Sequence, residues 1–368
     1  MRSSVKNIIL RLMLWTGLVR LFQFVHRKQT VILMIHGVMD NRAKPRWKPL
    51  RPQLAPAKLE EYLRGLSKRH HFISLTDALD MLEGRKPMTP YSVVLTFDDG
   101  YRNNITYALP ILHRYSAPAT FFLPTGFVSN PRPFWFDRLD YALQQAPVHG
   151  REVKVGSLSM RLDASSRNAL RESYKRLRRT AKELQMSDHD FLHDMEQLAC
   201  QLEAESGHAL SDLHRDDDWS AMMTWDQIEG CRGAAVTFGS HTVDHVRLDL
   251  VSAAEAREQL SRSKRDIEVH TGQTCFAVCY PNGSFSEETI AFARESGYRC
   301  GLTTEEGLNC VGDNVMALRR IDLPAEGSNI GLLVMLCGLS ELVSNTMARL
   351  AKMARHGQRT HDDGGDSR

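Results

Sequence analysis

The sequence predicts an α/β fold in which parallel strands are joined by helices. Short apolar runs rich in β-branched and aromatic residues have the length of buried strands, and they lie at 31–36, 92–97, 119–124, 234–240, 276–280 and 298–304. Longer segments with helical spacing of apolar residues separate them, at 57–68, 103–115, 253–270 and 287–296. This alternation favours a parallel sheet covered by helices, but it leaves open whether the sheet closes into a barrel.

The composition is that of an ordinary globular protein. The chain has 368 residues, of which 42% are hydrophobic and 25% charged, so it can bury a full core with additions to spare. A formal net charge of +3 gives no indication of a nucleic-acid partner. The seven cysteines lack paired C-x-x-C spacing, so we expect neither a disulfide scaffold nor a zinc ribbon.

A helical insertion is expected at 138–221, because this stretch contains no strand-like run. Its part at 165–185 carries seven Arg or Lys residues, and acidic and apolar residues at helical spacing follow. We expect the insertion to cover or border the rim of the α/β domain. Trp135 and Trp225, near its two ends, are interpreted as packing contacts rather than as platforms for stacking a sugar.

The two ends of the chain predict further helices. Residues 7–24 are strongly apolar, but Arg11 and Arg20 interrupt them and no small-residue cleavage site follows, which argues against a signal peptide or a membrane span. An amphipathic helix lying on a membrane surface is one interpretation, and packing on the barrel is the other. We accordingly expect a cytoplasmic or peripherally membrane-associated protein. The expected division is an N-terminal helix at 1–28, the α/β domain at 29–137 and 222–325, the insertion at 138–221, an apolar and basic helix at 326–356, and a disordered tail at 357–368.

Two short motifs predict a metal site with a spare carboxylate. Asp98 and Asp99 end the apolar run at 92–97, and His241 and His245 follow the strand-like run at 234–240. Two histidines and one carboxylate make three ligands and leave a position open for water, as in catalytic zinc sites. Neighbouring residues at a strand end point in different directions, so the second aspartate could face the substrate and take a proton. The alternative is that the aspartates cap the next helix and the histidines are ordinary surface residues.

The pair of motifs resembles the polysaccharide deacetylase family, which has the NodB homology domain. Its T-F-D-D-G and H-[ST]-x-x-H patterns are matched here at 96–100 and 241–245 without a substitution. The resemblance implies an irregular (β/α) barrel of about seven strands with the motifs on one rim. It also implies that Asp98 is the general base. The implied ligands of a divalent metal, commonly zinc with cobalt or nickel as substitutes, are Asp99, His241 and His245.

A third motif and a later arginine extend the resemblance. The segment at 276–283 reads F-A-V-C-Y-P-N-G and resembles the family's Y-P-x-G loop, which implies the backbone N–H of Asn282 as an oxyanion donor. The arginine that usually orients the base is missing from its place upstream of this motif. Arg320, in an R-I segment seen in many family members, is the candidate to hold Asp98 ionised. Its alternative is a surface cation at the end of a strand.

The general acid must also come from an unusual place. The family's leucine-x-histidine motif is missing after residue 320. The segment at 33–38 reads L-M-I-H-G-V and resembles the first strand of the poly-N-acetylglucosamine deacetylase branch. We therefore expect His36 to be the acid, since the unperturbed pKa of histidine is near neutral. The alternative is a packed histidine at a strand end.

The resemblance implies a metal-dependent deacetylase that releases acetate from an N-acetylated sugar. The substrate would be a polysaccharide or a lipid-linked glycan in the synthesis or modification of a cell-surface polysaccharide, and the apolar termini favour a lipid-linked or nascent polymer. One alternative is a catalytically degenerate, membrane-associated module that only binds glycan, as the departures from the acid and arginine motifs suggest. Glycoside hydrolysis by paired carboxylates is disfavoured because Asp98 and Asp99 are adjacent.

Overall fold

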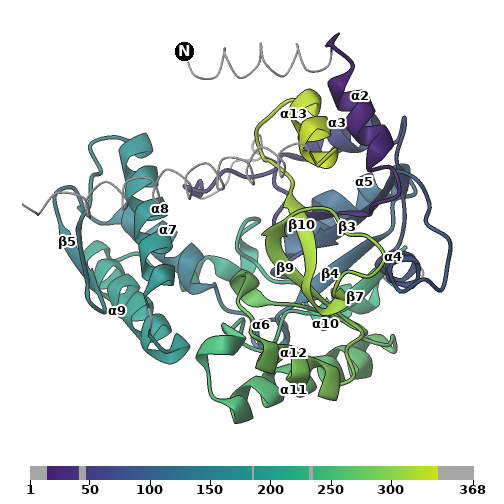
Figure 1. Ribbon diagram of the computed structural model, residues 1–368. Coiled ribbons are helices and arrows are strands. Elements are labelled where there is room, and N and C mark those ends of the chain that lie inside the picture. Colours follow the sequence, from purple (N-terminus) through teal and green to yellow (C-terminus); the bar gives the residue numbers. More distant parts are fainter. Residues whose placement is uncertain (1–14, 41–46, 185, 232–234, 339–368) are drawn as a thin grey trace, which may run out of the picture.

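Seven parallel strands form a closed barrel in the computed structural model, which describes residues 15–40, 47–184, 186–231 and 235–338. The barrel order is β1-β10-β9-β8-β7-β4-β3, and β1 pairs with β3 from Val31↔Val93 to Ile35↔Phe97 to close it (Figure 1). The strands are β1 Val31–Ile35, β3 Ser92–Phe97, β4 Ala119–Leu123, β7 Val236–Ser240, β8 Ala277–Cys279, β9 Cys300–Glu306 and β10 Leu318–Asp322, with β2 His71–Phe72 paired to the start of β3. The predicted (β/α) barrel is thus confirmed.

The strands are buried on both faces, which explains their continuous apolar runs. Every residue of β1, β3 and β4 is buried, as expected for parallel strands with side chains inside the barrel and helices outside it. On the outer face of the strands, under the helices, Phe97 and Phe121 meet edge to face with ring centroids 5.1 Å apart. This packing fixes the strand ends that carry the polar motifs.

Helices surround the barrel, and α11 shows ordinary caps at both of its ends. The Ser252 side chain accepts a hydrogen bond from the backbone N–H of Glu255 at the start of α11, and Gly272 ends that helix in the left-handed conformation. Around the barrel lie α3 Pro56–Leu66, α4 Leu75–Leu82, the π-helical turn Asn104–Ala108, α5 Leu109–Arg114, α6 Thr125–Ser129, α10 Trp225–Glu229, α11 Ala253–Thr271 and α12 Glu287–Glu295. The short 3-10 turns are Leu210–Asp212, His214–Asp216, Leu248–Leu250, Pro281–Gly283 and Val315–Ala317.

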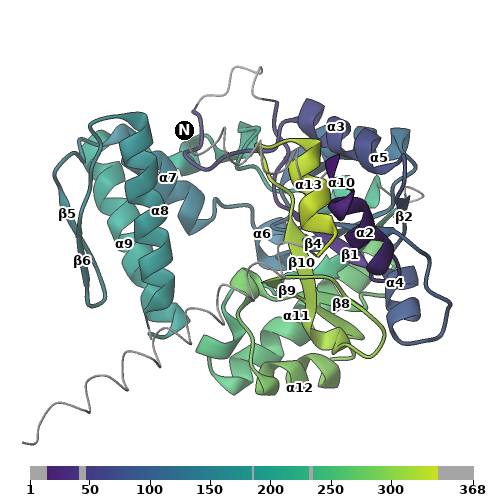
Figure 2. The same cartoon turned by 45° about the horizontal axis from the view of Figure 1, so that its top comes forward.

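The insertion forms a lobe beside the barrel, and it is not purely helical (Figure 2). It contains α7 Trp135–Gln145, β5 Glu152–Val155, β6 Leu158–Arg161, α8 Arg167–Glu183 and α9 Asp188–Ser206. The expectation of helices alone was wrong, because β5 and β6 pair as an antiparallel hairpin. Val153 and Val155 alternate with exposed residues and bury one face of the hairpin, and Gly156 turns the chain with a positive φ. This alternating pattern is only four residues long in each strand, which is too short to stand out against the helical segments around it.

The two tryptophans near the ends of the insertion pack in different places. Trp135 is buried in the core of the insertion and meets Phe191 edge to face, with ring centroids 5.1 Å apart. Trp225 instead stacks on His270 of α11 at 4.1 Å, and its indole N–H donates to the hydroxyl of Ser129. Both are therefore packing residues.

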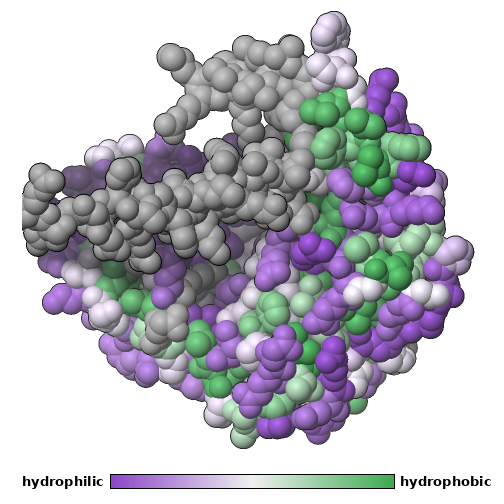
Figure 3. Space-filling view, viewed as in Figure 1, coloured by the Kyte–Doolittle hydropathy of each residue, from purple (hydrophilic) through white to green (hydrophobic). Residues whose placement is uncertain are grey.

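The described parts of the two termini pack against each other. Helix α2, Leu18–Val25, and helix α13, Asn329–Leu336, share an apolar cluster that includes Val19, Phe22, Leu333, Val334 and Cys337. Figure 3 shows a hydrophobic patch in the region of α2, where Leu21, Phe24 and Val25 are exposed. None of the helices in the described ranges is both long and apolar enough to cross a membrane. The expectations for residues 1–14 and 339–356, and for a disordered tail at 357–368, lie outside the described residues.

Candidate active site

The polar motifs meet at one rim of the barrel, where the carboxyl ends of the strands lie. His36 follows β1, Asp98 and Asp99 follow β3, and Arg320 lies near the end of β10. A cavity of about 200 Å³ opens at this rim; its lining includes His36, Asp98, Asp99, His241, His245 and Asn282. The structure thus brings together six of the seven residues that the sequence singled out, and the seventh, Arg320, is hydrogen-bonded to Asp98.

Unusual backbone conformations cluster at the same rim. Among the described residues six non-glycine residues have a positive φ, and four of them belong to the predicted motifs: Asp99 at 70°, Thr242 at 64°, His245 at 58° and Asn282 at 58°. Non-glycine residues reach this region at an energetic cost, and strained residues concentrate at functional sites. Here the unusual conformations include Asp99 and His245, two of the three predicted metal ligands.

Asp99, His241 and His245 fit a metal site with three protein ligands. The Asp99 Oδ1 atom lies 3.5 Å from His241 Nε2 and 3.4 Å from His245 Nε2, and all three residues are buried. Tetrahedral bonds of about 2.0–2.2 Å to a zinc ion would place ligand atoms about 3.3–3.5 Å apart. Burial alone would raise the pKa of Asp99, but hydrogen bonds from the two histidines hold it well below its usual value. These three residues therefore form a set of metal ligands, called the metal cage below, in which the Asp99 carboxylate is in its charged form.

A hydrogen bond from its Nδ1 nitrogen fixes the orientation of the His241 ring. Its Nδ1–H donates to the backbone carbonyl of Cys279 at 2.7 Å, which leaves Nε2 to face Asp99. Metal-binding histidines ordinarily have such a partner on the second nitrogen. A second possible ligand set, Asp98 with His241 and Cys279, is less suitable because both Asp98 oxygens already bind Arg320.

Asp98 is held by a buried arginine and caps no helix. Arg320 donates to Oδ1 and Oδ2 of Asp98 at 2.9 Å and 2.8 Å, and its Nε–H donates to the carbonyl of Thr303. Burial would raise the pKa of Asp98, but the Arg320 guanidinium outweighs burial and lowers it. Two parallel N–H···O bonds also fix the plane of the carboxylate. The structure therefore places Arg320 where an orienting arginine is needed.

The turn that carries Asn282 lies close against β9. Gly283 has a φ of +68°, and a Cβ there would lie 2.1 Å from the hydroxyl oxygen of Thr304. Only glycine fits this approach, which brings the backbone of Asn282 to the edge of the cavity. His36 also lines this cavity, and it lines as well a second hollow of about 470 Å³, called the outer hollow below, whose lining includes Asp322.

Comparison with known proteins agrees with this geometry. A family model described as polysaccharide deacetylase matches residues 85–196 and 204–301, which is more than half of the chain. The chain belongs to the polysaccharide deacetylase family.

Curated relatives share only part of their length with this family member. It is 28% identical over 99 residues to YxkH of Bacillus subtilis (strain 168), which is also named for polysaccharide deacetylation; the match covers 27% of this chain and 36% of that protein. It is 30% identical over 101 residues to the poly-beta-1,6-N-acetyl-D-glucosamine N-deacetylase of Escherichia coli (strain K12), covering 27% of this chain and 15% of that one. The chain thus spans well under half of the length of these relatives.

Solved deacetylases show the same fold. The Streptococcus pyogenes deacetylase PplD in complex with acetate superposes with a TM-score of 0.54 at 19% identity, over 84% of this chain and 98% of that one. IcaB from Ammonifex degensii gives a TM-score of 0.54 at 16% identity, over 84% and 97%. At these low sequence identities, the structural similarity supports only the fold of this polysaccharide deacetylase family member.

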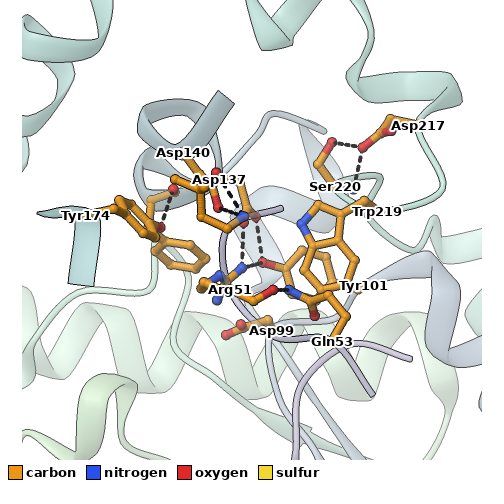
Figure 4. Close-up of polar contacts among 12 residues, drawn as sticks. Arg51, Gln53, Asp99, Tyr101, Asp137, Asp140, Tyr174, Asp217, Trp219 and Ser220 are labelled. Carbon is orange, nitrogen blue, oxygen red and sulfur yellow. Dashed lines mark hydrogen bonds and ion pairs between the residues drawn. The ribbon is translucent and has the colours of Figure 1, made fainter. Parts of the chain in front are cut away.

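Sequence reasoning missed a network beside the family motifs. Arg51 donates to Asp137 Oδ1 at 2.5 Å and to the hydroxyl of Tyr101, which itself donates to Asp137 Oδ2 at 2.6 Å; Figure 4 shows this network with Asp99 close by. Asp137 is fully buried, and Arg51 and Arg178 line the cavity. The buried acid within the apolar segment 134–139 was a visible signal. Nothing in the sequence connected it to Arg51 or Arg178.

Proposed function

We propose that the protein is a metal-dependent N-deacetylase that removes acetyl from an N-acetylated sugar and releases acetate. One observation carries the proposal: the buried, arginine-held carboxylate of Asp98 lies beside the Asp99, His241 and His245 cage in one cavity. The substrate is a polysaccharide or a lipid-linked glycan, in the synthesis or modification of a cell-surface polysaccharide. Kinship with polysaccharide deacetylases supports this substrate class.

Each residue of the site has a separate role in the proposed amide hydrolysis. A divalent ion held by Asp99, His241 and His245, zinc for preference and cobalt or nickel as substitutes, would supply Lewis acidity toward the amide carbonyl and the attacking water. Asp98 accepts the proton of that water, because Arg320 keeps it ionised and fixes its orientation. The backbone N–H of Asn282 donates to the oxygen that becomes negative in the tetrahedral state.

His36 is the proposed donor of a proton to the leaving nitrogen, and replacing it should slow the reaction without releasing metal. His36→Ala should lower kcat by about 100-fold, the lower range for loss of a general acid, while the metal content stays unchanged. Steady-state rates and metal analysis of the same sample would check this. Full activity in the variant would return the acid role to another group.

Product analysis separates the proposal from its alternatives. Purified protein incubated with N-acetylated oligosaccharides and lipid-linked sugars should release acetate and free amine in equal amounts. New reducing ends without acetate would instead identify a glycoside hydrolase. Glycan binding with no product from any substrate would favour the binding module, which has no use for a carboxylate held ionised as Asp98 is.

We further propose that α2 lies on an anionic lipid surface. Trp15, Leu21, Phe24 and Val25 leave between 56% and 86% of their surface exposed, and Arg20 and Lys28 lie beside them. An amphipathic helix with apolar and basic residues suits the lipid interface. Full-length protein should therefore sediment with vesicles that contain phosphatidylserine.

A paired substitution tests this role of α2. Leu21→Glu should weaken the vesicle binding by about tenfold or more, because it places a charge where apolar contact is expected. Val269→Glu, which changes another exposed apolar residue on α11, should not. Equal binding by both variants would contradict the proposal.

A further inference from the structure

We propose that Arg178 and Arg51 form an anion-binding subsite beside the metal cage. The sugar that is deacetylated then carries a negatively charged oxygen group, a phosphate or a carboxylate, close to its acetamide. This inference rests on the proposed function and narrows its substrate class.

Arg178 is a cation without a carboxylate partner at the edge of the active-site cavity. It comes from α8 of the insertion and lines both the inner cavity and the outer hollow. Its Nε–H is buried without a hydrogen-bond partner, and among the described residues no carboxylate lies within 4.0 Å of its guanidinium. Buried polar groups are nearly always paired in folded proteins, so an unpaired one at a cavity calls for a missing partner.

Aromatic rings hold the Arg178 guanidinium in place. Its central carbon lies 5.1 Å from the ring centroid of Phe136, 5.4 Å from that of Tyr174 and 5.9 Å from that of Trp135. Such rings stabilise a cation and fix its plane without occupying its N–H groups. The donors of Arg178 therefore remain available to a ligand in the cavity.

Arg51 supplies the second cation. Its NH2 group binds Asp137 and Tyr101, while its Nε–H is buried without a partner. The guanidinium lies 4.7 Å from the ring centroid of Phe136, the same ring that Arg178 contacts. Both cations therefore contact one aromatic ring in the lining of the cavity.

The charges of the cavity do not cancel. Asp98 is paired with Arg320, and Asp99 lies against the two histidines. Asp137 is in direct contact with Arg51 and interacts with Arg178 only at longer range, so Arg178 is the cation of the lining that contacts no carboxylate. Asp322 and Glu326 line the outer hollow, but neither is within 4.0 Å of Arg51 or Arg178. A guanidinium binds phosphate or carboxylate through two parallel N–H bonds, which makes an anionic substrate group the matching partner.

Binding measurements on matched variants test the subsite. The probes are N-acetylglucosamine, N-acetylglucosamine 1-phosphate and an N-acetylated sugar bearing a uronic carboxylate, each titrated by calorimetry into the full-length metal-loaded protein. Wild-type protein should bind at least one charged probe about tenfold or more tightly than the neutral sugar, as expected for a hydrogen bond to a charged group. The charged probe that binds more tightly than the neutral sugar shows whether the subsite prefers a phosphate or a carboxylate.

Arg178→Gln should remove that gain, whereas Arg179→Gln should keep it. Arg179 is the next residue on α8, is exposed, and lines a different hollow with Asp163 and Glu172. Both variants lose one positive charge and keep the metal cage, so a contact between phosphate and metal would be the same in both. The inference fails if wild-type protein shows no preference for either charged probe, or if Arg178→Gln keeps the preference. Because binding is measured apart from turnover, lack of acetate release would count against the proposed function alone.

Discussion

Asp98→Asn should lower kcat by about a thousandfold while the protein keeps its metal. Asparagine has the size of aspartate and can still accept one hydrogen bond from Arg320, but it cannot take a proton from water. Loss of a general base typically costs about 10²–10⁴ in rate. Acetate release and metal content measured on the same preparation would show whether the two effects separate as expected.

Folding of this variant needs its own control. Asparagine leaves the buried Arg320 charge without a counter-ion, and breaking a buried pair costs about 3–5 kcal/mol. The melting temperature should therefore fall, and activity should be compared well below it. Arg320→Lys keeps a charge but loses the two-fold hydrogen bonding, so it should retain more stability than a neutral replacement. A folded Asp98→Asn protein with wild-type turnover would remove Asp98 from the mechanism.

His245→Ala should release the metal and reduce acetate formation to background. His245 belongs to the cage with Asp99 and His241, whereas Cys279 belongs to the second buried set with Asp98 and His241. Removing a residue that hydrogen-bonds to a metal ligand already lowers metal affinity by about 10–100-fold. Removing a ligand itself should therefore lower it by more than about 100-fold. Metal titration into the chelated variant would measure this.

Cys279→Ser is the matched control for the choice between the two sets. Its side chain lies beside Asp98 and Arg320, and serine should leave metal binding at one ion per chain. If Cys279→Ser lost the metal and His245→Ala retained it, the ligand assignment would have to move to the second set.

The barrel and the central residues were predictable because their signals are local. Strands buried on both faces give continuous apolar runs, and the polar motifs stand directly after those runs. In a parallel barrel the ends of such strands meet at one rim, so Asp99, His241 and His245 had to approach one another. Arg320 was named for a different reason, because it stands in an R-I segment that resembles one seen in many family members.

The sequence alone could not predict that the insertion contributes residues to the cavity. Arg178 reaches the cavity only because α8 docks beside the barrel, and Arg51 only because its loop meets Asp137 of α7. Both depend on contacts between segments far apart in the chain, which neither periodicity nor motif spacing encodes. The β5–β6 hairpin was missed for a different reason, because its alternating pattern is too short to outweigh the helices around it.

Metal restoration tests the central claim most directly. The purified protein is freed of metal with a chelator, and acetate release from a substrate of the wild-type protein is followed as zinc, cobalt or nickel is added back. We expect no turnover without metal and a rate that rises with added ion until one equivalent per chain is bound. Full activity in the metal-free protein, or no recovery with any of the three ions, would contradict the account.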